Sequence, residues 1–257
     1  MYNLQQELCR LFETGVAPLF SDQFVIRTEQ KELVKQLTEV VSTHPSVQIL
    51  LTEMKRKIGQ YYDHSLRTGV LFLDLSLKQP GVVNFVGIPT LAIAGLLHDY
   101  GKTKIPPDIL FKPAKLSEEE RTIMNSHNQI GGLLLEQLQE REFPYLSQLV
   151  LQHHDYPRQG RIDHRKDERR EYEVALEICN RTTDDRSLFL QKRYENPTLT
   201  YAGALLSLAD YFDALSSPRD YKPAFSQKEV CLLIGSTHPG LEKELTYLSK
   251  RYGKEKA

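Results

Sequence analysis

The sequence predicts an all-α protein, and three observations support that prediction. The 257 residues are 40% hydrophobic and 26% charged, which is typical of a globular chain with one sizeable core or two small ones and excludes disorder and collagen-like repeats. Ser117 with Glu120, and Ser226 with Glu229, have the spacing of helix capping boxes. Apolar residues recur at helical spacing in two stripes: Leu33, Leu37, Val40 and Val41, then Ile58, Tyr61, Tyr62, Leu66, Val70 and Leu73.

Start and stop signals place the individual helices. Pro89 suits a first helical turn, Gly101 a helix end, and Pro106-Pro107 a rigid turn between elements. The first 45 residues form a shorter helical block without chemically distinctive residues, so we expect an N-terminal helical extension at 1–45 and a main domain at 46–257. Helices are expected near residues 4–13, 28–43, 47–78, 89–100, 117–139, 144–154, 200–215, 226–234 and 240–252.

One segment departs from the helical pattern. Half of the residues from Arg158 to Glu195 are charged, with both signs mixed, which predicts a surface insertion at 158–197. Within it, Tyr172, Val174, Leu176 and Ile178 alternate with more polar neighbours, so we expect a β-strand there. Residues 187–194 would return as the second strand of a hairpin. An irregular charged loop is the alternative.

Charge and cysteine content limit the partners and the compartment. The chain has 33 Lys and Arg against 34 Asp and Glu, so no global positive field recruits long nucleic acid, and an anionic ligand needs a local cluster. Three scattered cysteines, Cys9, Cys179 and Cys231, form no disulfide framework, which favours a reducing cytoplasm. The longest clean apolar run, 91–97, is too short for a bilayer, so we expect no membrane insertion.

Histidines and aspartates form the candidate metal site. His98-Asp99 follows the apolar run 91–97, and a buried carboxylate there needs a partner such as a divalent cation. Each histidine alone is as readily a hydrogen-bonded core residue, but several expected helices each offer one. His127 is expected within the helix that Ser117 opens. The candidate ligands are His64, His98, Asp99, His127, His153, His154 and Asp210, whereas His44, His164 and His238 are interpreted as surface residues.

These residues occur in an order that resembles the HD-GYP branch of the HD-domain metal-dependent phosphohydrolases. The resemblance runs from about 64 to 225 and rests on His98-Asp-Tyr-Gly-Lys102, Ile105-Pro-Pro-Asp-Ile-Leu110, Lys112-Pro-Ala-Lys-Leu116, Met124, His127, Gly131, His153-His154 and Leu208-Ala-Asp-Tyr-Phe-Asp-Ala-Leu215. It implies an all-helical HD bundle that uses iron or manganese to hydrolyse phosphodiesters, above all cyclic di-GMP. The seven candidate ligands match the family's metal ligands. Lys102 matches its lysine near the scissile phosphate, and Arg219 and Lys222 match its phosphate-binding pair.

Two departures from the family pattern refine this expectation. Members with three metals carry a Glu where this chain has Gln60, a weaker ligand, so we expect two divalent ions. The Gly-Tyr-Pro motif is missing, since His153-His154 is followed by Asp155-Tyr-Pro-Arg-Gln-Gly160, and the charged insertion replaces a short glycine-rich lid. The metal chemistry therefore matches the family, whereas the loop that faces the substrate does not.

The requirements of phosphodiester hydrolysis indicate a role for each of these residues. Two nearby metals produce a bridging hydroxide and clamp the phosphoryl oxygens, with Asp99 as the expected bridging ligand. Lys102 would neutralise the phosphate or assist the leaving oxygen. Asp213 follows Asp210 by three residues and would orient the attacking water, with an exposed acid or a helix partner as the alternative. Arg67 is a weaker candidate for the same cleft, with a surface salt bridge as its alternative.

The sequence thus predicts a cytoplasmic metal-dependent phosphodiesterase acting on a cyclic dinucleotide, with cyclic di-GMP first. One alternative keeps the metal centre but acts on another nucleotide or a phosphomonoester. The other is a catalytically weak signalling module that binds a protein partner through residues 158–195. The sequence does not decide whether the chain forms a homodimer.

Overall fold

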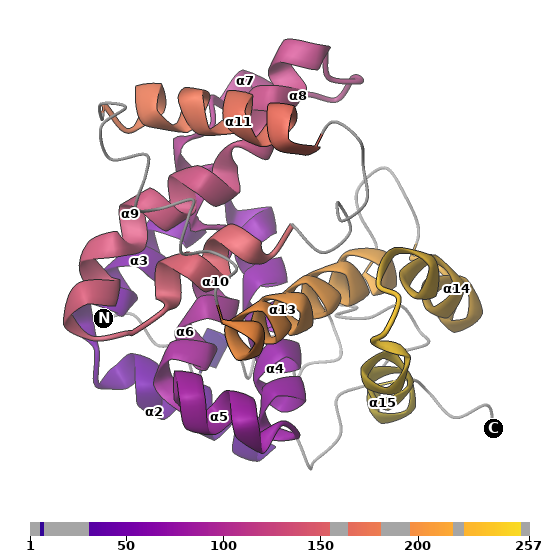
Figure 1. The fold of residues 1–257 in the computed structure, drawn as a ribbon. Coiled ribbons are helices and arrows are strands. Elements are labelled where there is room, and N and C mark those ends of the chain that lie inside the picture. The colour runs from indigo at the N-terminus through magenta and orange to yellow at the C-terminus, as the bar shows by residue number, and fades with distance from the viewer. Residues whose placement is uncertain (1–5, 8–30, 155–163, 181–195, 218–223, 253–257) are drawn as a thin grey trace.

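The structure, a computed structural model, describes residues 6–7, 31–154, 164–180, 196–217 and 224–252. Within these ranges every regular element is a helix, which confirms the predicted all-α class (Figure 1). The helices are α2 (Lys31–Ser42), α3 (Pro45–Lys57), α4 (Gly59–Leu77), α5 (Pro80–Val86), α6 (Ile88–Leu97), the 3-10 helix η2 (Tyr100–Lys104), α7 (Pro107–Leu110), α8 (Glu118–Asn125), α9 (His127–Arg141), α10 (Leu146–Gln152), α11 (His164–Ile178), α13 (Pro197–Ser216), α14 (Gln227–Thr237) and α15 (Glu242–Tyr252).

Helix α4 lies at the centre of the bundle. It packs against α6 and α13, and it also touches α2, α3, α5 and α15. Helices α9 and α10 pack against each other, and α10 continues the contact to α6 and α13 (Figure 1). A single hydrophobic cluster runs from Leu33 in α2 to Tyr252 in α15. The helices that carry the candidate ligands therefore share one core.

Small residues let α4 and α6 approach closely. A Cβ atom added to Gly95 would lie 2.8 Å from the Cα of Gly69, and one added to Gly69 would lie 2.7 Å from Leu96 Cδ2. Any larger side chain at this crossing would push the two helices apart. Since α4 carries His64 and α6 leads into His98, the glycine pair sets the distance between two candidate ligands.

Two of the expected helices are each divided in two. The expected 47–78 helix breaks at Ile58, whose φ of −137° is not helical, just before Gly59, a poor helix former. The expected 117–139 helix breaks at Ser126, whose hydroxyl donates to the Ile123 carbonyl at 2.7 Å and competes with the helical backbone. The expectation that His127 lies inside the helix opened by Ser117 is therefore wrong, because His127 begins α9. Both predicted capping boxes are present.

The predicted strand at residues 172–178 is also wrong, because these residues belong to α11. The buried residues there are Glu171, Tyr172, Ala175 and Leu176, a spacing that forms one face of a helix. That face packs on α8 and α9, and burial against these helices decided the structure over the alternation of residue types. The proposed return strand at 187–194 lies outside the described residues.

Helix α2 makes up most of the described part of the predicted N-terminal extension, which also includes residues 6–7. Its Leu33, Leu37 and Val41 are buried in the common core, where α2 packs on α4 and α6. The boundary at residue 45 stays a prediction, since most of residues 1–30 lie outside the described ranges.

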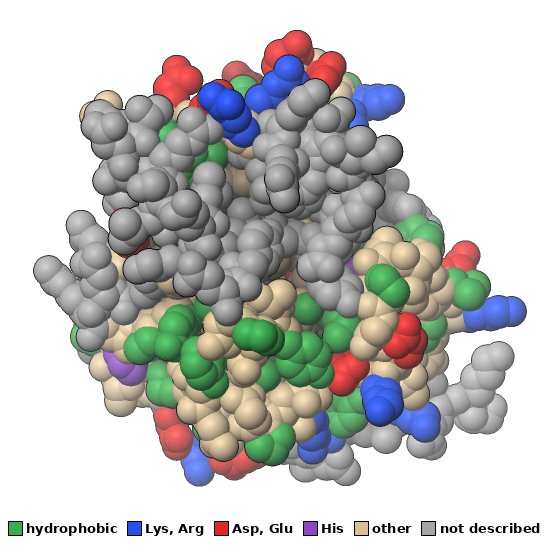
Figure 2. All heavy atoms as spheres, viewed as in Figure 1, with side chains coloured by type: hydrophobic (Ala, Val, Ile, Leu, Met, Phe, Trp, Pro, Cys, Tyr) green, Lys and Arg blue, Asp and Glu red, His purple; other side chains and the backbone are tan. Residues whose placement is uncertain are grey.

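The described surface is polar over some helices and apolar over others. Figure 2 shows charged side chains over α8 and α11 at the top, and hydrophobic side chains below the centre, around α5 and the start of α13. Among the described helices, no single one has the length and apolar character to cross a membrane. Helices α5 and α6 with η2 meet those criteria only as a pair that bends by 90°.

Candidate metal centre and active site

Three candidate histidines sit at helix ends and are held in the same way. His98 follows α6, His153 follows α10, and His127 begins α9. In each, Nδ1 contacts the carbonyl oxygen three residues earlier, at 2.9 Å for His98, 2.7 Å for His127 and 2.5 Å for His153. A carbonyl only accepts, so Nδ1 carries the proton and Nε2 presents its lone pair when the ring is neutral. Local backbone geometry thus prepares three Nε2 atoms as metal ligands.

The surroundings of two of these Nε2 atoms indicate whether a metal ion would fit the site. Nε2 of His98 and Nε2 of His153 are buried and have no hydrogen-bond partner. Buried polar atoms are rarely left unpaired unless a ligand or ion completes them. Carboxylate oxygens face them: Nε2 of His98 lies 3.6 Å from Asp99 and 3.9 Å from Asp210. Imidazole nitrogens with carboxylate oxygens form a donor set that suits a divalent transition metal, so the residues fit such an ion.

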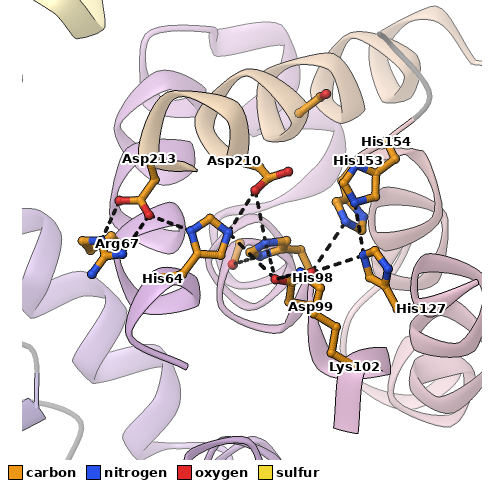
Figure 3. Close-up of polar contacts among 12 residues, drawn as sticks. His64, Arg67, His98, Asp99, Lys102, His127, His153, His154, Asp210 and Asp213 are labelled. Carbon is orange, nitrogen blue, oxygen red and sulfur yellow. Dashed lines mark hydrogen bonds and ion pairs between the residues drawn. The ribbon is translucent and has the colours of Figure 1, made fainter. Parts of the chain in front are cut away.

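His64 is held by carboxylates instead of backbone (Figure 3). Its Nδ1 lies 2.6 Å from Asp213 and its Nε2 lies 2.9 Å from Asp210. Arg67 donates to both oxygens of Asp213, at 2.6 and 3.0 Å. Asp213 is fully buried, so the alternative of an exposed acid is wrong. Arg67 and Asp213 form a buried pair that orients His64 from behind.

Asp99 lies between the histidines in Figure 3. Its Oδ1 is 3.3 Å from His127 Nε2, and its Oδ2 is 3.8 Å from His64 Nε2. Lys102 donates to the same Oδ2 at 2.6 Å. One carboxylate therefore faces histidines on both sides, as a bridging ligand must, and has a cation one turn away along the chain.

Burial and charge separate the protonation states of the histidines. Burial alone would lower the pKa of His64, but hydrogen bonds to Asp210 and Asp213 raise it to about 9. Burial lowers the pKa of His98, and burial with the neighbouring His98 and His127 lowers that of His153 to about 3. Without metal, His64 is thus protonated at neutral pH, whereas His98 and His153 are neutral.

The three aspartates are ionised despite their burial. Burial opposes ionisation of Asp99, yet the charge of Lys102 holds its pKa well below the usual value. The same opposition is overcome at Asp210 by the hydrogen bond from His64 and at Asp213 by Arg67, so both pKa values are lowered. A divalent ion held by His64 would have to displace the proton on that ring, so metal binding here would be linked to proton release.

Among the described residues, three groups of three side chains could each hold a metal ion, because the ligand atoms within each group lie within 4.8 Å of one another. His127 and His154 face each other through Nε2 atoms 3.1 Å apart, and the rings of His153 and His154 lie 4.0 Å apart. The structure thus brings all seven candidate ligands into one site. The groups are His64, His98 and Asp99; His98, His153 and Asp210; and His127, His153 and His154.

Gly101 brings Asp99 close to His127. A Cβ atom on Gly101 would lie 1.8 Å from the His127 carbonyl oxygen and 2.6 Å from the Gly131 nitrogen. Helix η2 therefore packs backbone to backbone on the first turn of α9, which only glycine permits. This contact fixes the distance between the candidate ligands Asp99 and His127.

For four further residues, the structure either differs from the predicted role or does not describe the residue. Arg219 and Lys222, predicted to bind the substrate phosphates, lie outside the described residues. Asp213, predicted to orient the attacking water, has its oxygens directed at Arg67 and His64. Arg67 is not in a surface salt bridge, since its side chain is 13% exposed beside a fully buried carboxylate.

The interpretation of His238 as a surface residue is wrong. His238 is buried after α14, with Nε2 3.1 Å from the Ser207 hydroxyl and Nδ1 2.9 Å from that of Thr237. Burial lowers its pKa to about 4. Its ring contacts the ring of Tyr211 in α13 edge-on, with the ring centres 5.0 Å apart. His44 is half-buried on Phe143, and the side chain of His164 lies outside what the structure describes.

Tyr61, predicted from the sequence only as part of an apolar stripe, lies beside the candidate site. The Nζ atom of Lys102 lies 4.5 Å from the centre of its ring, a cation–π contact. Tyr61 precedes His64 by three residues, and this helical spacing was a signal that both share one face of α4.

Comparison with known proteins agrees with this geometry. A family model described as HD domain matches residues 61–215. The chain is 35% identical over 144 residues to a cyclic di-GMP phosphodiesterase of Vibrio cholerae, covering 55% of this chain and 25% of that protein. It is 30% identical over 134 residues to a cyclic di-GMP phosphodiesterase of Pseudomonas aeruginosa, covering 50% of this chain and 31% of that protein.

A further relative carries a different substrate name. It is a 3'3'-cGAMP-specific phosphodiesterase of Vibrio cholerae, 26% identical over 143 residues, which cover 53% of this chain and 21% of that protein. The chain therefore spans less than a third of the length of these curated relatives. The family match itself covers more than half of the chain and includes every candidate metal ligand. This chain belongs to the HD-domain family, and its relatives named as cyclic di-GMP phosphodiesterases support the HD-GYP type within it.

Proposed function

We propose that this chain is a metal-dependent phosphodiesterase that hydrolyses a cyclic dinucleotide, with cyclic di-GMP as the first substrate. The observation that supports it most is the pair of buried, unpartnered Nε2 atoms of His98 and His153 facing Asp99 and Asp210. The relatives named above as cyclic di-GMP phosphodiesterases support the substrate class. A cytoplasmic location is part of the same proposal.

The metal complement belongs to the proposal as well. We propose two divalent ions per chain, iron or manganese, held by the seven candidate ligands. Gln60 is exposed and offers only a neutral amide, which supports two ions over three. Such ions supply positive charge to the phosphoryl oxygens and lower the pKa of water.

The chain's own residues set up the reaction in three ways. Asp99 presents two oxygens to histidines on opposite sides. Lys102 would exchange part of its contact with Asp99 for a phosphate oxygen and neutralise charge there. Asp213 and Arg67 would act as positioning residues that hold His64 in one orientation, which replaces the predicted water-orienting role of Asp213. Arg219 and Lys222 stay proposed phosphate ligands.

Metal analysis beside a hydrolysis assay tests this function. Protein purified without chelator should contain about two transition-metal ions per chain and convert cyclic di-GMP to linear product. His98→Ala should lose metal and activity together. His44→Gln is the matched control, since His44 also contacts a backbone carbonyl through Nδ1, at 2.6 Å, outside the site. Metal-free protein whose two variants behave alike would contradict the proposal.

A second substrate is favoured by one comparison. The 3'3'-cGAMP-specific relative matches 53% of this chain at 26% identity. Initial rates with cyclic di-GMP and 3'3'-cGAMP, measured side by side on one preparation, decide between them. Faster turnover of 3'3'-cGAMP would transfer the assignment to that substrate and leave the metal chemistry unchanged.

A further inference from the structure

We propose that Phe111 and Tyr61 form a stacking platform for a nucleobase of the substrate, beside the phosphate-binding position of Lys102. This inference rests on the proposed function and adds a base-binding subsite to it.

The platform begins at Lys102. Its Nζ atom contacts Asp99 at 2.6 Å and lies 4.5 Å from the centre of the Tyr61 ring. The Tyr61 ring in turn lies 6.5 Å from the ring of Phe111, tilted by 41°. An aromatic surface therefore leads outward from the cation that would meet the phosphate. In a nucleotide, one sugar separates the phosphate from the base, so the base of a nucleotide whose phosphate contacts Lys102 is within reach of this surface.

Phe111 is exposed where a phenyl ring normally is not. It is 46% exposed, one of five large hydrophobic residues with this property among the described residues. An exposed ring next to a polar site is a typical contact for a flat apolar ligand. Every nucleobase has such a face, and stacking on aromatic side chains is a common way of binding it.

The backbone around Phe111 is held in place before any ligand binds. The Phe111 amide donates to the Pro107 carbonyl at 2.9 Å, and the Tyr61 hydroxyl donates to the Leu110 carbonyl at 3.3 Å. The next residue, Lys112, binds both oxygens of Glu120, at 2.6 and 2.7 Å. Because these contacts fix the segment, stacking orders few additional groups, which favours binding.

The proposed platform predicts which nucleotides should bind more tightly than others. Stacking depends on ring area, so purine nucleotides should bind more tightly than pyrimidine nucleotides. It makes no hydrogen bonds to base edges, so guanine and adenine should differ little on this surface. Cyclic di-GMP and 3'3'-cGAMP would both use it.

Binding of a fluorescent nucleotide tests the platform without turnover. The probe is 2-aminopurine riboside 5'-monophosphate, whose fluorescence falls when the base stacks and which has no diester bond to cleave. It is titrated into the metal-loaded protein, and inorganic phosphate is titrated separately as a competitor. Phe111→Ala should weaken probe binding by about 5-fold to 150-fold, which corresponds to the loss of one stacked base. Its affinity for inorganic phosphate should not change.

Two further variants control the experiment. Phe111→Tyr keeps an aromatic ring and should restore probe binding to near the parent value. Phe85→Ala removes another exposed phenyl, 37% exposed and stacked on Tyr145 at 4.9 Å, and should leave binding unchanged.

Either of two results overturns the platform: Phe111→Ala binds the probe as the parent does, or it loses probe and inorganic phosphate equally. Failure of the proposed hydrolysis is a separate observation. In that case the parent protein would bind and quench the probe but cleave no cyclic dinucleotide.

Discussion

The two sides of the metal centre hold their histidines by different means. On one side, His98, His127 and His153 are oriented by carbonyl oxygens three residues earlier in the same chain segment. On the other side, His64 is oriented by Asp213, which lies 149 residues away in the sequence, and Asp213 is itself held by Arg67. We call these the backbone-held side and the carboxylate-held side.

The difference shows in charge. On the backbone-held side, burial lowers the pKa values of His98 and His153, so these two imidazoles are neutral at neutral pH. The carboxylate-held side carries a protonated His64, whose pKa is raised to about 9 despite its burial. One side is therefore ready to bind a cation, whereas the other must first release a proton.

Asp99→Asn should have the largest effect, because Asp99 faces both sides. The amide loses the negative charge, and we expect metal affinity to fall by more than about 100-fold, the upper end of the loss for an outer ligand partner. Metal content after dialysis against a competing chelator measures this. Retention of both ions by the variant would contradict the bridging position of Asp99.

Asp213→Asn should affect the carboxylate-held side alone. The amide keeps the shape but removes the charge that orients His64, so we expect a loss of about 10- to 100-fold in the affinity for one of the ions. Isothermal titration of the metal-free protein measures both sites separately.

Asp74→Asn is the matched control for that change. Asp74 is also a buried carboxylate of this bundle, on α4, and it accepts from Arg251 at 2.6 Å and Tyr252 at 2.7 Å. It should lower stability without changing metal affinity. Equal loss of metal affinity in the two variants would show that Asp213 acts through general stability alone.

Gly101→Ala should disturb the backbone-held side through packing. Its methyl group would lie 1.8 Å from the His127 carbonyl oxygen, so η2 and α9 must separate. We expect a loss of about 1–3 kcal/mol in the free energy of unfolding, the range for overpacked sites, together with weaker metal binding.

Urea unfolding of the metal-free protein measures the stability change. Gly59→Ala is its control, because a Cβ there meets no atom within 4 Å. If the Gly101 variant matches this control in both stability and metal affinity, the backbone contact does not set the site.

The stability of the metal-free protein should depend on pH on both sides of the site. The pKa of His64 is about 9 in the folded protein, above the usual histidine value of 6.5. Its stabilising contribution is therefore complete below pH 6.5 and is lost as the pH rises toward 9. His153 has a folded pKa of about 3, so it costs stability as the pH falls below 6.5 toward 3.

The urea midpoint of chelator-treated protein, measured from pH 5 to pH 9, should therefore fall on both sides of about pH 6.5. Asp213→Asn should flatten the alkaline decline, because it removes one of the contacts that raise the pKa of His64. A midpoint that is constant between pH 6.5 and pH 9 in the parent would contradict the protonation of His64.

The sequence predicted the features that depend on short stretches of chain. Capping spacing identified the starts of α8 and α14, and the apolar run before His98-Asp99 predicted a buried ligand pair at a helix end. The alternation of apolar and polar residues within 172–178 led to the wrong prediction of a strand. A pattern of residue types over seven residues does not show which neighbours bury the segment. Burial on α8 and α9 made it helical.

What the sequence by itself determined is therefore the all-α class, the seven candidate ligands that the fold brings together and, through the helix ends, the local setting of His98 and His153. Tertiary structure alone decided that Asp213 and Arg67 hold His64, that His238 is buried and that Tyr61 lies beside Lys102. The physical reason is range. A helix end is defined by backbone bonds over three or four residues, whereas a carboxylate chooses its partner only when packing has brought α4 and α13 together.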